Sequence, residues 1–252
     1  MKSPFIKKLG LLYEPVAVYF TDEKPEGALQ FQEGKRGCVA SMLLAAARQK
    51  KTAVFDEHTY GCPGGGVGIC FGNAFVAQGH PTERLLSTGF LDLPDGGKQM
   101  PEHLRRGERF FASPELVKKW KQEMPYTVSG KRYVVFYPFS LAPDDREPDL
   151  MVLFANPDQL SVLVITAGYH RGTVCNTVAP FGAACHNILF AYQESKKAQP
   201  NAVLGFFDIS QRDQLPRELL SFTVPFAMFR EMEQGADEGC MTTPAWQQIA
   251  GR

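Results

Sequence analysis

Apolar and polar positions along this chain follow two different spacings, and the shorter spacing indicates β-strands. In the segment EPVAVYF, residues 14–20, Val16, Val18 and Phe20 fall on one face, as expected for a strand with a period of two residues. Other short apolar runs predict further strands. They lie at residues 52–55, 131–139, 149–154, 202–210 and 220–226.

The longer spacing predicts helices between these strands. Residues 38–49, CVASMLLAAARQ, contain neither glycine nor proline and are rich in good helix formers. Ser113-Pro114-Glu115 is a typical helix start, and the predicted helix ends before Pro125. Asn156 with Gln159 forms a capping-box pattern, and we favour a helix there over a strand. Helical patterns also cover residues 184–195 and 227–234.

The order of these elements predicts the fold class. Strands and helices are mixed without strict alternation, and no low-complexity linker interrupts the chain. We therefore expect one mixed α/β (α+β) globular domain over residues 1–252, with a mixed sheet flanked by helices.

Two segments, residues 37–56 and 184–208, share an order of features. Each has a cysteine at a helix start, a Lys-Lys pair after the helix, and an apolar strand that ends in Phe-Asp. Their spacing differs by five residues, and short helix–strand units can match by chance. A weak internal repeat is one interpretation, and it would place Cys38 and Cys185 at equivalent ends of two units.

Composition removes several classes of function. Lys plus Arg and Asp plus Glu both number 27, so the charge balance gives no electrostatic reason to expect nucleic-acid or anionic-membrane binding. No apolar run reaches membrane-spanning length, and Glu14-Pro15 interrupts the N-terminal apolar residues, unlike a secretory signal. We expect a cytoplasmic protein. In that reducing setting, six cysteines indicate buried thiols, metal ligands or redox groups rather than disulfides.

The cysteines carry the main candidate chemistry. Cys38 follows Arg36-Gly37 at a predicted helix start, where backbone N–H groups and the guanidinium favour a thiolate. Cys62 and Cys70 flank a glycine-rich loop, residues 61–72, whose N–H groups could form an anion-binding nest. Three thiolates beside backbone donors are typical of an iron–sulfur cluster. The predicted ligands are Cys38, Cys62, Cys70 and Cys185, with Arg36, Gly64, Gly65 and Gly66 lining the cofactor.

Alternatives stay open at this point. Cys175 or Cys240 could replace Cys185 as the fourth ligand, or that position could stay open for a substrate. The spacing matches neither common ferredoxin pattern nor a zinc site. The glycine stretch matches neither a P-loop nor a dinucleotide fingerprint, and Cys62 and Cys70 could simply pack a tight turn. We expect His186 to be surface or partly buried, and Asp208 could face a cleft at its strand end.

The pattern as a whole resembles a known family. EPVAVYF, the cysteine-led helix, CPGGG after a short strand, LLSFTVPF and the closing TTPAWQQI are similar to a prokaryotic domain of unknown function, number 169. The similarity runs from about Leu12 to Ile249. It implies a coherent fold and a cytoplasmic prokaryotic setting, without an assigned reaction. Family cysteines at the helix start and before the Gly-Gly correspond to Cys38 and Cys62.

Two main functions follow as hypotheses. The first is a cysteine-dependent protein that binds an iron–sulfur cluster for electron transfer or for reduction of a small molecule, with a redox partner protein. The alternative is a non-catalytic protein that binds an anionic small molecule through the glycine-rich loop. A third is a thiol enzyme with Cys38 as nucleophile. The sequence leaves the oligomeric state undetermined.

Overall fold

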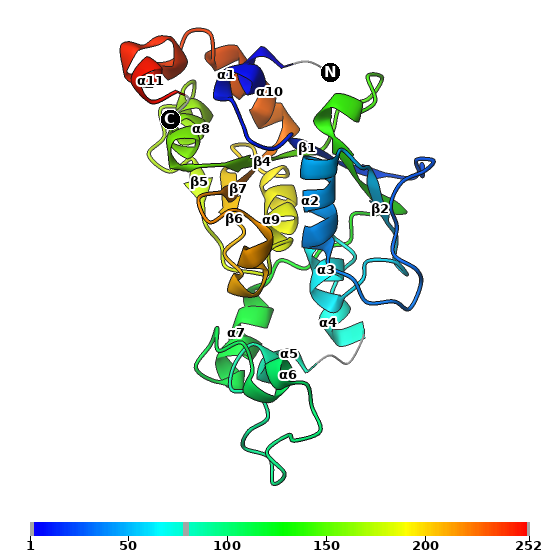
Figure 1. Cartoon of the computed structure of the whole chain (residues 1–252). Coiled ribbons are helices and arrows are strands. Elements are labelled where there is room, and N and C mark those ends of the chain that lie inside the picture. The colour runs from blue at the N-terminus through cyan, green and yellow to red at the C-terminus, as the bar shows by residue number, and fades with distance from the viewer. Residues whose placement is uncertain (1–2, 78–80, 251–252) are drawn as a thin grey trace. The chain divides into compact units, whose positions relative to one another are not determined.

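The computed structural model describes residues 3–77 and 81–250, and within them the chain forms a single open sheet with helices on both faces (Figure 1). The sheet has seven strands in the order β2-β3-β1-β4-β7-β6-β5. All neighbouring strands pair antiparallel except β5 and β6, which are parallel. The strands are β1 (Val16–Thr21), β2 (Ala53–Phe55), β3 (Tyr133–Pro138), β4 (Leu150–Ala155), β5 (Thr177–Val178), β6 (Ala202–Gly205) and β7 (Leu220–Pro225). The predicted mixed α/β class is confirmed.

The chain's residues gather into two compact units. The main unit comprises Met1–Gly72 and Thr127–Arg252, and the insert unit comprises Asn73–Tyr126. The single domain predicted for residues 1–252 stays a prediction. The helices of the main unit are α1 (Pro4–Leu9), α2 (Val39–Gln49), α3 (Pro63–Gly68), α8 (Pro157–Gly168), α9 (His186–Glu194), α10 (Phe226–Gly235) and α11 (Pro244–Ile249), with 3-10 turns η1 (Phe139–Leu141), η2 (Ile209–Gln214) and η3 (Cys240–Thr242).

The alternation of side chains along the strands produces two hydrophobic layers. Ala17 and Tyr19 of β1 belong to the core that packs beneath α1, α8 and α10. The intervening residues, Val16, Val18 and Phe20, are also buried, and the Phe20 ring lies 4.5 Å from the Tyr192 ring of α9. Helices α2 and α9 cover this second face (Figure 1). Burial on both faces explains why the strands read as nearly continuous apolar runs.

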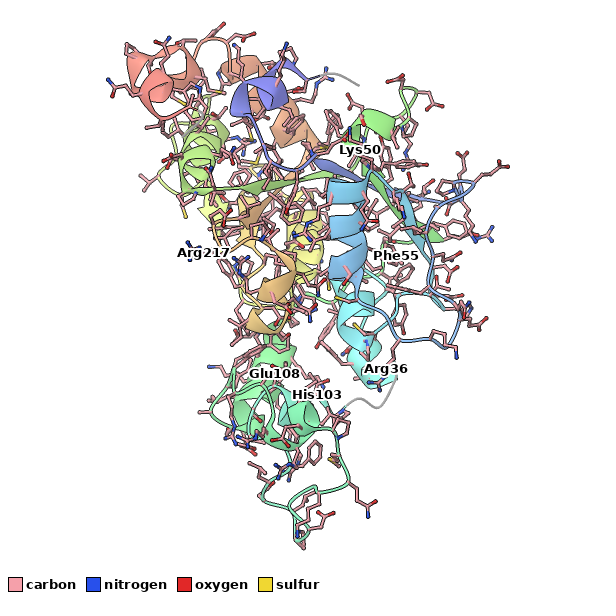
Figure 2. The ribbon with its side chains drawn as sticks, in the orientation of Figure 1. Arg36, Lys50, Phe55, His103, Glu108 and Arg217 are labelled. Carbon is pink, nitrogen blue, oxygen red and sulfur yellow. The ribbon has the colours of Figure 1, made fainter. Side chains whose placement is uncertain are left out.

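Local signals explain the ends of the main helices. Asn156 and Gln159 form a complete capping box at the start of α8, which confirms the helix favoured there. Helix α2 ends at Lys50, which has a left-handed backbone with φ of 54° and whose N–H bonds to the Ala45 carbonyl. Figure 2 shows Lys50 and Arg36 toward opposite ends of α2. The cysteine end of α2 therefore lies at the opposite end from Lys50, near α3.

The two halves of the main sheet have matching topology. From the β2 edge toward the middle of the sheet the strand order is β2-β3-β1, and from β6 toward the middle it is β6-β7-β4. In the first half α2 connects the inner strand β1 to the outer strand β2, and β3 lies between these strands in the sheet. In the second half α8, β5 and α9 connect the inner strand β4 to the outer strand β6, and β7 lies between them. The predicted repeat segments supply the equivalent pieces, α2 with β2 and α9 with β6. Duplication itself stays a prediction, but Cys38 and Cys185 occupy equivalent N-cap positions.

Over residues 73–77 and 81–126, the insert unit contains four short helices and a cluster of aromatic side chains. They are α4 (Ala74–Ala77), α5 (Thr82–Leu85), α6 (Glu102–Arg106) and α7 (Pro114–Glu123). Ser113 caps α7 through its hydroxyl, as the sequence predicts. The Trp120 ring of α7 lies 5.7 Å from Phe111 and 6.3 Å from Phe75, and Lys121 pairs with Glu83 at 2.7 Å. All these contacts lie within the insert unit and stabilise it.

Candidate functional site

Three cysteines stand at the N-cap positions of three helices. Cys38 precedes α2, Cys62 precedes α3 and Cys185 precedes α9. Cys38 and Cys62 have extended backbones, as is usual for an N-cap residue. The nearby Cys38 helps to raise the pKa of Cys62, and the nearby Cys62 and Cys38 help to raise the pKa of Cys185, so the three side chains lie near one another. We call Cys38, Cys62 and Cys185 the cysteine centre.

The glycine-rich segment that we predicted as a loop is a helix, and this corrects the sequence interpretation. Pro63 occupies the first position of α3, where its fixed φ suits a helix start. The Gly65 N–H donates to the Cys62 sulfur at 3.2 Å, and the Gly66 N–H donates to the Cys62 carbonyl at 2.9 Å. These N–H groups serve the helix start and its cap. They do not form the open anion-binding nest that we expected.

The glycines of α3 allow close contact with two other helices. A Cβ atom on Gly65 would lie 2.7 Å from a methyl group of Val39, the first residue of α2. A Cβ atom on Gly68 would lie 2.8 Å from the Cys185 sulfur and 3.0 Å from the Cys185 carbonyl oxygen. Any side chain at these two positions would push α3 away from the starts of α2 and α9. The glycines therefore bring the cysteine centre together.

Each thiol of the cysteine centre has a defined neighbour. The Cys38 sulfur lies 3.1 Å from Oε1 of Gln211 in η2, and the Cys185 sulfur lies 3.6 Å from the Gly64 carbonyl oxygen. Both neighbours are oxygen acceptors, so these two sulfurs act as S–H donors. The Cys62 sulfur instead accepts a hydrogen bond from the Gly65 N–H.

Burial sets the ionisation of two of these thiols. It raises the pKa of Cys62, although the N–H groups of Gly65 and Gly64 and the Arg36 guanidinium act in the opposite direction. It raises the pKa of Cys185 well above its ordinary value, and the nearby Cys62, Cys38 and Asp208 add to this. We expected the glycine segment to keep thiolates ionised, but desolvation outweighs the backbone donors at Cys62. Both groups are thiols at neutral pH.

The structure does not bring Cys70 to this group. Cys62 and Cys70 stand at opposite ends of α3, and eight residues at 1.5 Å per residue separate their Cα atoms by about 12 Å. Cys70 is fully buried, has a left-handed backbone with φ of 66°, and has a pKa raised to about 12 by burial. Its charged neighbour is Lys196, which partly offsets this rise. Cys70 is a core thiol.

The other predicted site residues differ from one another in burial and in location. Arg36 is exposed on the Cys62 side of the centre, Gly64 is half-buried, and Gly65 and Gly66 are buried inside α3. Asp208 is buried, caps η2 through its Ser210 contacts and interacts with Cys185. Among the alternatives for a fourth ligand, Cys175 is exposed and Cys240 is half-buried next to the opposite core.

Sequence reasoning underestimated His186 and did not identify Gln211. His186 is almost fully buried, and its Nε2 lies 3.0 Å from the Gly64 carbonyl oxygen. Burial lowers the pKa of His186 to about 4, so the ring is neutral and donates from Nε2. Its place beside Cys185 was a visible signal. Gln211 carries no such signal, because only the fold brings η2 to Cys38.

The side chains as they stand do not form a metal site. Over residues 3–77 and 81–250, no group of three or more His, Cys, Asp or Glu side chains is arranged to hold a metal ion. The cysteine centre supplies the right donor chemistry for a soft metal, with three sulfur atoms and nearby backbone N–H groups. Ligation therefore requires the Cys38 and Cys185 side chains to turn away from Gln211 and Gly64.

Comparison with known proteins identifies the family. The model of domain of unknown function 169, described as an uncharacterised ArCR family, matches residues 5–235. This chain belongs to that family, as its motifs indicated. No curated protein and no solved structure gave a significant match. In the part of the chain that is described, no helix has both the length and the apolar character needed to cross a bilayer.

Proposed function

We propose that this protein is a cysteine-dependent redox protein that binds an iron–sulfur cluster through Cys38, Cys62 and Cys185. The observation that carries this proposal is that three N-cap cysteines, Cys38 and Cys62 from the first half of the chain and Cys185 from the second, lie near one another. Cys185 enters from the second half of the sheet, and the proposed ligand set omits Cys70 because it follows the far end of α3. The cluster would serve electron transfer or reduction of a small molecule.

The surroundings of the centre fit a negatively charged group held by sulfur ligands. The N–H groups of Gly64 and Gly65 are directed toward the Cys62 sulfur, and such donors stabilise cluster and ligand sulfurs. The Arg36 guanidinium adds positive charge on the same side. Burial of Cys185 keeps water away from one side of the centre. A cluster there would have a reduction potential set by these donors and by burial.

The energetic cost of forming the site is modest. Cys38 must give up its contact with Gln211 and Cys185 its contact with the Gly64 carbonyl, at about 1 kcal/mol for each ordinary hydrogen bond. The raised pKa values of Cys62 and Cys185 mean that metal binding must also release their protons. Loading should therefore be stronger at higher pH. Structural zinc sites bind their metal with about 10–16 kcal/mol at pH 7, so metal ligation by protein side chains can exceed costs of this size.

A second candidate is binding of a small anion without a cluster. The specific observation that favours it is Arg36, an exposed guanidinium beside Cys62 that makes no ion pair within the described residues. The N–H groups of Gly65 and Gly66 donate hydrogen bonds at the start of α3, so fewer backbone N–H donors remain for an anion than we predicted from the sequence.

The proposal includes a setting and partners. All six cysteines are free thiols, which accords with a reducing cytoplasm. The partners would be a small-molecule substrate or a redox protein, with no role in binding nucleic acid or membranes.

The experiment is a measurement of iron and acid-labile sulfide, with a visible spectrum, on the full chain purified without oxygen. Wild-type protein should contain both, with a colour that dithionite bleaches. Cys38→Ser, Cys62→Ser and Cys185→Ser should each lose most of the iron, while Cys175→Ser and Cys70→Ala should retain it. Circular dichroism checks that each variant folds.

Two results would contradict the proposal. Colourless wild-type protein that resists reconstitution with iron and sulfide would favour the anion-binding candidate. Loss of iron in Cys70→Ala with retention in Cys185→Ser, both folded, would show that the ligand set proposed here is wrong.

A further inference from the structure

The segments that lead into α2 and α3 are in contact immediately before their cysteines. The Gly37 N–H donates to the Gly61 carbonyl at 3.2 Å, so the residues that precede Cys38 and Cys62 are joined through their backbones. A Cβ atom on Gly61 would lie 2.7 Å from the Gly37 carbonyl oxygen, and Gly61 also has a positive φ of 75°. A glycine is therefore needed for this close approach.

The residues after the two cysteines are in contact as well. The point where a Cβ atom on Gly65 would stand is 2.7 Å from a methyl group of Val39 and 3.4 Å from the Cys62 sulfur. The Cys62 sulfur thus lies beside the first turn of α2, and Cys38 is the residue between the two contacts. The nearby Cys38 also helps to raise the pKa of Cys62. Cys38 and Cys62 are therefore neighbours in the fold.

The two thiols are accessible from solvent, and the third thiol of the centre is not. Cys38 and Cys62 are half-buried, whereas Cys185 is only 5% exposed. A Cβ atom on Gly68 would lie 2.8 Å from the Cys185 sulfur, so α3 packs directly against that sulfur. A small molecule in solution can therefore reach the first two sulfurs but not the third.

Only a weak contact holds the Cys38 sulfur away from Cys62. Its S–H donates to Oε1 of Gln211 at 3.1 Å, and a thiol is a weak hydrogen-bond donor. Gln211 belongs to η2, which has no buried residue. A disulfide requires Cα atoms about 4.4–6.8 Å apart with side chains directed toward each other. The main change needed is thus a turn of the Cys38 side chain from Gln211 toward Cys62.

We propose that Cys38 and Cys62 form a reversible disulfide by exchange with a small disulfide such as oxidised glutathione. The Cys38 thiolate attacks one sulfur of the oxidant, a mixed disulfide forms, and one glutathione leaves. The Cys62 thiol then loses its proton and attacks the Cys38 sulfur, which releases the second glutathione. Two protein thiols are oxidised to one disulfide, and the oxidant is reduced to two glutathione thiols.

The disulfide does not depend on a metal. It uses two of the three sulfurs of the cysteine centre, so an oxidised chain could not hold a cluster there. The N–H groups of Gly64 and Gly65 donate to the Cys62 sulfur and stabilise negative charge on it during the second step.

The test maps thiols in the full chain. Wild-type protein is purified with a metal chelator, reduced, freed of reductant and exposed to mixtures of reduced and oxidised glutathione. Acid stops the exchange, and the remaining thiols are alkylated with N-ethylmaleimide in urea. Trypsin releases Cys38 in residues 37–48, and Cys62 together with Cys70 in residues 52–84. Wild type should lose two of its six thiols to a linkage between these peptides, with Cys70 still alkylated.

Single variants identify the two partners. In Cys62→Ser, Cys38 should retain one bound glutathione, because no second thiol displaces it. Cys38→Ser should give no linkage, and Cys185→Ser should give the same linkage as wild type. The exposed Cys175 is the internal control for simple modification and should carry glutathione without joining the linkage. Circular dichroism checks that each variant folds.

Three results would overturn the proposal. Cys38 and Cys62 could both remain open to alkylation when oxidised glutathione is in large excess. Wild-type Cys38 could keep a bound glutathione while Cys62 stays free, which would show that the two sulfurs do not meet. A linkage to residues 52–84 that persists in folded Cys38→Ser, or disappears in folded Cys185→Ser, would assign the bridge to a different pair.

Discussion

His186 should make the stability of this protein fall sharply below neutral pH. The ring is almost fully buried behind the cysteine centre, where Nε2 donates to the Gly64 carbonyl at 3.0 Å. Burial lowers its pKa from 6.5 to about 4 in the folded protein. A group whose folded pKa is lowered stabilises the fold above its unfolded pKa, and this contribution is lost as pH falls toward the folded value.

The size of the effect follows from the two pKa values. The interval from 6.5 to about 4 corresponds to about 3 kcal/mol at about 1.4 kcal/mol for each pKa unit. Between pH 7.5 and pH 5.0, we expect a loss of about 2 kcal/mol from this residue, because most unfolded chains but few folded ones carry the proton at pH 5.0. That is a sizeable part of the stability of an ordinary domain.

Urea unfolding of wild type and His186→Gln at the two pH values measures this loss. Glutamine can still donate to the Gly64 carbonyl but does not titrate, so the variant should be less stable at pH 7.5 and should lose about 2 kcal/mol less on acidification. The carboxylates titrate in both proteins, so subtracting the loss of stability of His186→Gln from that of the wild type removes their contribution. His58→Gln is the control, since the His58 side chain is 64% exposed.

Equal losses in wild type and His186→Gln would refute the reasoning. The ring would then be accessible to water or already protonated in the folded state, and the burial of His186 against the Gly64 carbonyl would be wrong. A loss that disappears in His58→Gln instead would assign the titration to the surface.

Two further predictions concern the helix with the glycines and the core thiol. Gly68→Ala should lower the free energy of unfolding by about 1–3 kcal/mol, because the new Cβ would lie 2.8 Å from the Cys185 sulfur. Gly64→Ala should be neutral or stabilising by up to about 1 kcal/mol, because the nearest atom to its new Cβ would be 3.9 Å away. Urea midpoints that rank the two variants the other way would contradict the packing of α3. Cys70 should resist iodoacetamide at pH 8.5 while the exposed Cys175 reacts, because burial raises the pKa of Cys70 to about 12. Peptide mass spectrometry would disprove this if both residues were labelled at similar rates.

Local patterns in the sequence determined the elements and the fold class. The alternation in residues 14–20 identified β1, and the composition of residues 38–49 identified α2 with Cys38 at its start. The capping box at Asn156 located α8. These features could be predicted because a strand period or a helix cap involves residues only a few positions apart. The family motifs were equally local, and the family assignment is confirmed.

Propensity alone misjudged the glycine segment. Each glycine in a helix costs about 1 kcal/mol relative to alanine, so four glycines in six residues predict a loop. Helix α3 forms because Gly65 and Gly68 permit contacts with Val39 and Cys185 that no larger residue could allow. Contacts between helices thus outweigh an unfavourable local preference.

Tertiary structure also decided which cysteines meet and in what form. Cys62 lies eight residues from Cys70 yet shares its centre with Cys185, more than a hundred residues away, because α3 separates the first pair and the sheet brings α9 beside α2. Gln211 reaches Cys38 in the same way. Burial raises the pKa of Cys62 and Cys185, and the extent of that burial could not be predicted from the sequence. The sequence by itself determined the elements and which residues carry chemistry, since those signals are local. Only packing across the fold decided the neighbours and the protonation state of each thiol, since both depend on distances and solvent exclusion between segments far apart in the chain.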